Sequence, residues 1–174
     1  MAVTVTATGA ATTEVVIVKD PDVVPPAATL TVAGTTAEGG KFDIGQYQGK
    51  IVVVDFSATW CAPCRALLPN LKEVYDKYHG RGVEIVGVSL DRTLSDLTDF
   101  LDKEKLPWIT VIGEEIDGHL EFPIAEKYGV MLIPTTFLVD KQGKIAAISH
   151  GEDIAQQIEK LLGESQAEKA ADSK

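Results

Sequence analysis

A short apolar run, followed at once by two cysteines and a helical pattern, places the strongest limit on what this chain can fold into. Residues 51–56 are apolar and mostly β-branched, except for Asp55, which is typical of a strand in the middle of a sheet. Cys61 and Cys64 come next, and apolar residues then recur every three or four positions as far as His79. We therefore predict that a helix begins at the cysteine pair, where the chain leaves a buried strand.

Strand and helix patterns also alternate along the rest of the chain. The pattern predicts a hairpin that pairs Leu30 and Val32 with Phe42 and Ile44, and strands over 83–90, 107–112, 135–139 and 145–149. It predicts helices over 61–79, 94–103 and 153–162, and a short helix that ends at 128–129. Residues after Ile112, including Glu114 and Glu115, are expected to form a loop, and Gly80 is expected to end the first helix. This order predicts an α/β fold, in which a central mixed β-sheet carries helices on both faces.

The two ends of the chain differ in composition from its middle. Residues 1–27 are rich in Thr, Ala and Val, contain Pro25-Pro26, and are expected to form a flexible leader or linker. Residues 28–163 would form the folded domain, and residues 164–174, which are polar and rich in alanine, would form a disordered tail.

Charge and cysteine content exclude several classes of function. The net charge of −10 argues against nucleic acid or an anionic membrane as a partner. No run of about 18 apolar residues predicts a membrane span, and the first residues lack the basic and apolar parts of a secretory signal. Two cysteines three positions apart do not cross-link distant segments, and with no second Cys or His pair at ligand spacing we expect no metal. We expect no cofactor either.

The spacing of Cys61 and Cys64 favours disulfide chemistry. A cysteine at a helix N-terminus faces unpaired N–H groups and the positive end of the helix dipole, which favour its thiolate. Cys64 lies one turn later, so its sulfur can reach Cys61 and resolve a mixed disulfide formed there. Pro63 fixes φ in the first turn. We therefore expect Cys61 to be the exposed, attacking thiol and Cys64 the shielded one.

Several segments, in the same order along the chain, resemble the thioredoxins. Residues 55–64 (Asp-Phe-Ser-Ala-Thr-Trp-Cys-Ala-Pro-Cys) resemble the active-site segment of that superfamily, and Pro69 matches the proline of its active-site helix. Residues 127–130 and 133–138 resemble the segment that carries a cis-proline. Residues 42–49 and the helix at 94–103 resemble the TlpA/ResA-like branch, which implies a thioredoxin fold with an N-terminal β-hairpin extension and an inserted helix.

The resemblance implies a function and a role for each matching residue. It implies a thiol–disulfide oxidoreductase that reduces or exchanges protein disulfides and is itself recharged by an upstream thiol reductant. Pro134 would be cis and would pack against the cysteines, and Trp60 would flank the sulfurs. The substrate would contact these two residues and, beside them, Ala62, Pro63, Ile133 and Thr135.

Asp55 is the third catalytic candidate. It interrupts an apolar strand, where an unpaired carboxylate is costly, so its pKa is expected to be raised, and a raised pKa suits a general base for the Cys64 thiol. A purely structural, hydrogen-bonding Asp55 is the alternative. The chain also departs from the family pattern: Ser57 replaces an aromatic residue, and Gly87 stands where small thioredoxins carry a lysine near the buried acid.

Two other functions stay open from the sequence. A thiol peroxidase of related fold would carry Pro-x-x-x-Thr-x-x-Cys, but Val54 and Ala58 occupy the proline and threonine positions. An interaction module without enzymatic activity often loses a cysteine or the cis-proline, and this chain keeps both. We expect a monomer without membrane contact. TlpA/ResA-like proteins usually act outside the cytoplasm, which favours that location if the sequence is part of a longer precursor and a cytoplasmic one otherwise.

Overall fold

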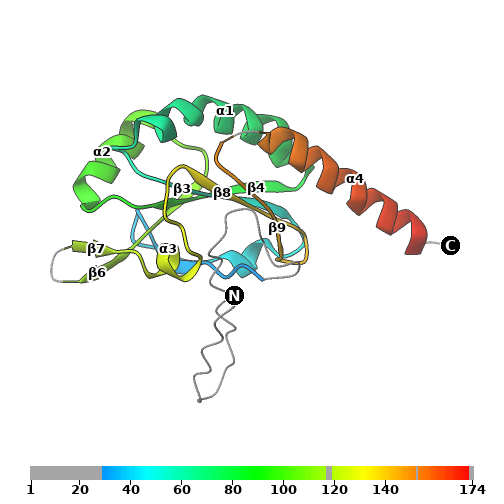
Figure 1. Cartoon of the computed structure of the whole chain (residues 1–174), viewed down its shortest axis with the longest axis horizontal. Helices are drawn as coiled ribbons and strands as arrows, with labels where there is room; N and C mark the ends of the chain where they lie inside the picture. The colour runs from blue at the N-terminus through cyan, green and yellow to red at the C-terminus, as the bar shows by residue number, and fades with distance from the viewer. Residues whose placement is uncertain (1–28, 117–118, 152, 173–174) are drawn as a thin grey trace, which may run out of the picture.

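A seven-stranded mixed sheet forms the centre of the computed structural model, which describes residues 29–116, 119–151 and 153–172 (Figure 1). From one edge to the other the strands are β2 (Lys41–Asp43), β1 (Ala33–Thr36), β5 (Ile109–Ile112), β4 (Val83–Ser89), β3 (Ile51–Ser57), β8 (Thr135–Val139) and β9 (Ile145–Ser149). The three central strands β3, β4 and β5 run parallel, and the outer strands are antiparallel to their neighbours. The predicted mixed sheet is confirmed.

Helices cover both faces of this sheet, also as predicted. On one face lie α1 (Ala62–Tyr78), α2 (Leu94–Glu104) and α4 (Ile154–Asp172), and on the other lies α3 (Pro123–Lys127) together with the short 3-10 helix η1 (Ile44–Tyr47) (Figure 1). The α1 and α4 side packs its apolar residues against alternate residues of the strands, including Ile51, Val53, Val83, Ile85 and Leu138. The opposite core uses the intervening residues, among them Val52, Val54, Phe56, Val86 and Phe137.

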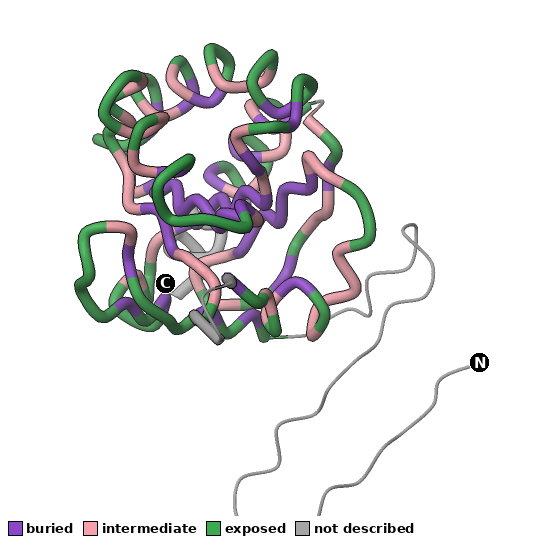
Figure 2. The backbone as a smooth tube through the Cα atoms, turned by 90° about the vertical axis from the view of Figure 1, so that its left-hand side faces the viewer, coloured by how far each residue is buried: buried purple, intermediate pink, exposed green. Residues whose placement is uncertain are grey.

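Burial is nearly complete in β3 and β4. All residues of these two strands are buried except Ser57, which is half-buried, and the central strands stand out as buried in Figure 2. A parallel strand covered on both faces needs apolar residues at consecutive positions. In β3, residues 51–54 and Phe56 meet this need, and in β4 Val and Ile fill four of the seven positions. Asp55, on the face covered by α1, is the charged exception in β3.

The N-terminal hairpin and the inserted helix are present, with small shifts in position. β1 begins at Ala33, later than predicted, while Leu30 and Val32 are buried in the core on the α3 side. Thr93 caps α2, and its hydroxyl accepts the Asp96 N–H.

The C-terminal end of α1 differs from the prediction. After Tyr78 the chain continues into a 3-10 turn, η2 (His79–Arg81), so the residue with positive φ is Gly82 and not the predicted Gly80.

Two further predictions were wrong. The expected loop after Ile112 contains a second hairpin, β6 (Glu114–Ile116) and β7 (His119–Glu121), whose backbone pairing compensates for weak strand propensity. The last helix was expected to end near Leu162, with a disordered tail from residue 164. Instead α4 continues to Asp172, through a segment rich in the helix-forming residues Ala, Glu, Gln and Lys. The predicted leader, 1–27, lies outside the described residues.

Candidate active site

The two cysteines form a disulfide at the beginning of α1. Their sulfurs are 2.09 Å apart and their Cα atoms 5.3 Å apart. Cys61 is the N-cap of the helix in an extended conformation, and its Sγ accepts the Cys64 N–H at 3.2 Å, while Pro63 lies in the first turn. When the disulfide is reduced, that N–H and the helix dipole favour negative charge on the Cys61 sulfur. The local geometry therefore favours a thiolate on Cys61 over one on Cys64.

Exposure does not separate the two cysteines in the disulfide form. Cys61 is 5 % exposed and Cys64 7 % exposed, so the expected contrast between an open and a shielded sulfur is not seen here. Ala62 and Pro63, between them, are exposed. The difference between the two sulfurs in this state comes from the helix N-terminus and not from access to solvent.

The segment before β8 packs against the disulfide. The Ile133–Pro134 peptide bond is cis, the Ile133 carbonyl oxygen lies 3.8 Å from the Cys61 Sγ, and the Ile133 side chain contacts the cysteine cluster. Thr135 is buried, and its hydroxyl donates to the Leu132 carbonyl at 2.6 Å. The Thr135 hydroxyl is therefore hydrogen-bonded within the protein, and this bond ties Thr135 to the residue just before Ile133 and Pro134.

His150, at the end of β9, also supports this segment and was not found from the sequence. Its Nδ1 lies 3.1 Å from the Pro134 carbonyl oxygen and 3.3 Å from the Thr135 hydroxyl. A carbonyl oxygen only accepts, so we place the ring hydrogen on Nδ1. No motif marks His150, because the contact depends on β8 and β9 being neighbours.

Large apolar side chains are exposed beside the disulfide. Trp60, directly before Cys61, is 66 % exposed, and Met131 and Leu132, directly before Ile133, are 89 % and 74 % exposed. Exposed apolar residues that gather in one place often mark an interaction site. The sequence indicated Trp60 but neither Met131 nor Leu132.

Asp55 lies beneath α1 with no basic side chain across from it. In β3 it stands opposite Gly87 of β4 and Thr136 of β8, and the Thr136 hydroxyl donates to its Oδ1 at 3.1 Å. Burial raises the pKa of Asp55 from 3.8 to about 6, against the lowering effect of hydrogen bonds from Ser57 and Thr136. The lysine that small thioredoxins carry has no counterpart at Gly87, so no cation at that position adds to the lowering effect of these two hydrogen bonds.

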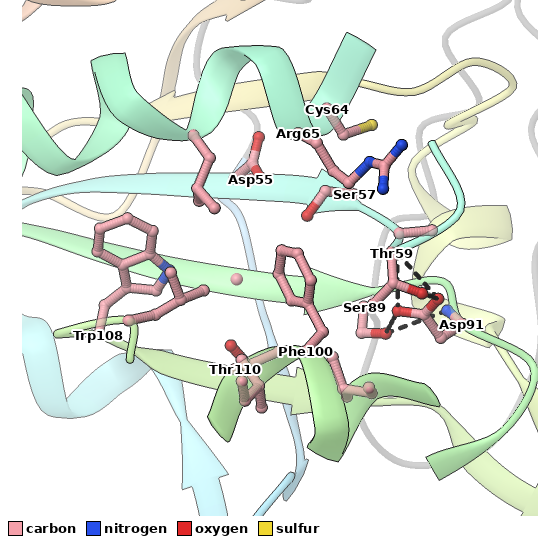
Figure 3. A pocket seen from close by; sticks show the side chains of 16 residues that line it. Asp55, Ser57, Thr59, Cys64, Arg65, Ser89, Asp91, Phe100, Trp108 and Thr110 are labelled. Carbon is pink, nitrogen blue, oxygen red and sulfur yellow. Dashed lines mark hydrogen bonds between the residues drawn. The ribbon is translucent and has the colours of Figure 1, made fainter. Parts of the chain in front are cut away.

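A cavity of about 40 Å³ connects Asp55 with Cys64 beneath α1 (Figure 3). Its lining also includes Gly87 and Thr110, whose buried hydroxyl has no hydrogen-bond partner among the described residues. A water needs on the order of 10–15 Å³ and two to four polar partners. The space is therefore large enough to hold water between Asp55 and Cys64.

A second buried carboxylate, Asp91, lines the same cavity near the loop that leads to Cys61. It accepts the Thr59 N–H at 2.9 Å and 3.2 Å on its two oxygens, the Thr59 hydroxyl at 2.6 Å, and the Ser89 hydroxyl at 2.9 Å (Figure 3). Sequence reasoning missed Asp91, since an acidic residue just after a strand is usually part of a solvated loop.

Within residues 29–116, 119–151 and 153–172, no three His, Cys, Asp or Glu side chains are arranged to hold a metal ion. Nor does any of the described helices have the length and apolar content needed to cross a membrane.

Two cysteines that close a small ring at a helix N-terminus, after one of the central strands of such a sheet, are suited to exchange with other disulfides. Fold and site thus define the class: a thiol–disulfide oxidoreductase with a thioredoxin fold. The family model described as thioredoxin-like matches residues 49–145. The chain belongs to this thioredoxin-like family.

Individual relatives agree with this assignment. The chain is 35 % identical over 128 residues to the thiol-disulfide oxidoreductase ResA of Bacillus thuringiensis, covering 74 % of this chain and 70 % of the relative. It is 33 % identical over 145 residues to ResA of Geobacillus thermodenitrificans, covering 76 % and 80 %.

Solved structures agree as well. The thioredoxin domain of a thiol-disulfide oxidoreductase from Bacteroides vulgatus has a TM-score of 0.71 and 28 % identity, covering 80 % of this chain and 99 % of that one. A thiol:disulfide interchange protein from Bacteroides sp. has a TM-score of 0.66 and 28 % identity, covering 79 % and 89 %.

Proposed function

We propose that this chain reduces or exchanges disulfide bonds of other proteins, with Cys61 as the attacking cysteine and Cys64 as the resolving one. The observation that carries the proposal is the position of the Cys61–Cys64 disulfide at the N-terminus of α1, beside the Ile133–Pro134 segment. A two-electron exchange at this position needs neither a metal nor an organic cofactor.

The reaction begins with the dithiol form. The Cys61 thiolate attacks one sulfur of a substrate disulfide, which forms a mixed disulfide and releases the other substrate sulfur as a thiolate that takes up a proton. The Cys64 thiol then gives its proton to Asp55, directly or through one water in the cavity, and its thiolate attacks the Cys61 sulfur. The second substrate sulfur leaves as a thiolate and takes up a proton. Two electrons have then passed to the substrate, and an upstream thiol reductant restores the dithiol.

The substrate would bind over the exposed apolar side chains that flank the disulfide. Trp60, Met131 and Leu132 supply contact area. The backbone of Ile133 and Pro134 offers an extended segment for pairing, and Ala62 and Pro63 form the exposed first turn. Thr135 and His150 hold the cis-proline segment in place through hydrogen bonds to the carbonyl oxygens of Leu132 and Pro134, and Thr135 stays a proposed substrate contact.

Reduction of insulin by the dithiol form tests the proposal. The wild-type chain should reduce insulin with multiple turnovers when a thiol reductant is supplied, and Cys61→Ser should abolish the reaction. Cys64→Ser should accumulate mixed disulfides through Cys61, because the resolving thiol is missing. If Cys61→Ser traps substrate instead, the two roles are reversed. Lack of insulin reduction by the wild type, with rapid consumption of hydrogen peroxide, would favour a thiol peroxidase. If neither reaction occurs, the fold serves as a binding module.

The role of Asp55 as a general base has a separate test. Asp55→Asn should slow the resolving step about 10-fold or more, while the first attack by Cys61 keeps its rate. Stopped-flow reduction of a model disulfide, followed by thiol release, separates the two steps. Glu84→Gln is the matched control. Glu84 is another buried carboxylate, but it lies near the start of β4, three residues before Gly87, which pairs with Asp55. An unchanged resolving rate in Asp55→Asn between pH 6 and pH 9 would make Asp55 purely structural.

A further inference from the structure

Asp91 is a buried carboxylate held by neutral groups alone. It is 1 % exposed, and no ion pair among the described residues includes it. A buried carboxylate is costly unless hydrogen bonds satisfy it. Here the donors are the Ser89 hydroxyl and, from the loop between β3 and α1, both the N–H and the hydroxyl of Thr59 (Figure 3). One residue of that loop therefore contributes most of the bonds that hold the carboxylate.

The loop that Asp91 holds is the one that carries the attacking cysteine. Thr59 lies inside a turn closed by the Cys61 N–H, which donates to the Ala58 carbonyl at 3.1 Å. Just before this turn, the Leu90 N–H donates to the Ser57 carbonyl at 2.8 Å, which extends the pairing of β3 and β4. The turn is thus fixed to β4 at its start and by Asp91 at its centre, two residues before Cys61.

The hydrogen bonds between Asp91 and Thr59 matter most once the Cys61–Cys64 disulfide is reduced. In the disulfide form, the bond to Cys64 fixes the Cys61 sulfur. In the dithiol form that bond is gone, which leaves two things to place the sulfur: the backbone of the turn and the Cys64 N–H, which donates to Sγ in the disulfide form. Attack on a disulfide needs the sulfur aligned with the bond that breaks, and a displacement of about 1 Å can cost on the order of 100-fold in rate.

We propose that Asp91 is a positioning residue for Cys61: by holding the Ala58–Cys61 turn through Thr59, it aims the Cys61 sulfur at the incoming disulfide. The inference rests on the proposed function, because it assigns Cys61 the attacking role. Asp91 does not touch the reacting sulfurs. It acts through charge-assisted hydrogen bonds to the turn, which are shorter and stronger than bonds between neutral groups.

The test is the pH profile of the first attack by the reduced protein on insulin, measured in single turnovers. Loss of positioning lowers the plateau rate at high pH, whereas a change in local charge moves only the midpoint of the profile. Asp91→Ala removes both acceptor oxygens and should lower the plateau about 10-fold or more. Asp91→Asn keeps an oxygen for the Thr59 donors and should keep the plateau within about 3-fold of wild type.

Glu84→Gln is the control for the loss of any buried carboxylate. Glu84 precedes Ser89 by five residues in β4, on the order of 16 Å along the strand. The Glu84→Gln variant should be less stable than wild type and should attack insulin at the wild-type plateau rate. If folded Asp91→Ala attacks insulin at the wild-type plateau, the proposal is wrong.

A second variant keeps the test decisive if Asp91→Ala does not fold. Thr59→Val keeps the shape of the side chain but removes the 2.6 Å hydroxyl bond, and should lower the plateau about 3-fold or more. A wild-type plateau in Thr59→Val would then overturn the proposal. If the wild-type chain attacks no insulin disulfide, the proposed function fails. The same plateau comparison with oxidised glutathione, a small disulfide, then decides the role of Asp91 by itself.

Discussion

The buried carboxyl of Asp55 should make the stability of this protein fall as the pH rises through the acid range. Its pKa is about 6 in the folded chain, against an ordinary value of 3.8. Between these two values the unfolded chain loses its proton while the folded chain keeps it. The folded state then binds more protons, so the free energy of unfolding decreases with pH. Below pH 3.8 the carboxyl is protonated in both states and imposes no penalty.

The size of the effect follows from the distance between the two pKa values. The gap between 3.8 and about 6, at about 1.36 kcal/mol per pH unit, corresponds to about 3 kcal/mol of lost stability above pH 6. Asp55→Asn removes the ionisable group and keeps an oxygen that accepts the Thr136 hydroxyl. The variant should therefore resemble wild type near pH 4 and be more stable by about 2–3 kcal/mol near pH 8.

Urea unfolding of the oxidised protein and of Asp55→Asn, from pH 4 to pH 8, measures this difference. All other titrating groups are shared by the two proteins, so their contributions cancel in the comparison, and the disulfide stays intact in both. Glu84→Gln should behave in the opposite way at neutral pH, because Glu84 is buried in an ion pair with Lys50 at 2.6 Å and its loss leaves that pair broken. A stability difference between wild type and Asp55→Asn that stays constant from pH 4.5 to pH 7.5 would refute the reasoning.

Three further predictions concern the sulfurs and their surroundings. Iodoacetamide at neutral pH should modify Cys61 of the reduced protein about 10-fold faster than Cys64, because only Cys61 caps the helix; mass spectrometry with Cys64 as the main product would reverse the assignment. Equilibration with glutathione should give a reduction potential of about −220 to −280 mV, since no histidine lies between the cysteines to stabilise the thiolate further, and a value near −120 mV would contradict this. Trp60→Ala should raise the KM for insulin about 5-fold or more without changing alkylation of Cys61; an unchanged KM would place substrate contact elsewhere.

The parts of the fold that could be predicted are those with a local cause. A run of β-branched residues in β3, the helical spacing after Cys61 and the cap at Thr93 each specify their element within a few residues. The end of α1 shows the limit of this reasoning. Gly80 and Gly82 both suit a left-handed position, and only the extra 3-10 turn of η2 decides in favour of Gly82.

What could not be predicted depends on which strands become neighbours. His150 reaches the Pro134 carbonyl because β9 pairs with β8, and the sequence separation of 16 residues gives no periodic signal for this contact. The position of Gly87 opposite Asp55 similarly requires the register of β3 on β4. The β6–β7 hairpin is held by backbone pairing in a segment whose acidic side chains argue for a loop.

Asp55 and Asp91 are two buried aspartates at one site for which we propose different roles. Both are buried, both line the cavity that touches Cys64, and the sequence presents each simply as an acid in or after an apolar strand. Asp91 accepts hydrogen bonds on both oxygens from donors fixed to the loop and to β4, so its oxygens are committed to holding that loop. Asp55 receives only hydroxyl donors, has a raised pKa, and shares the cavity with the sulfur that must lose a proton. Because a general base needs an oxygen that is not already committed, the number and placement of the donors support the proposed general-base role of Asp55 and the proposed positioning role of Asp91.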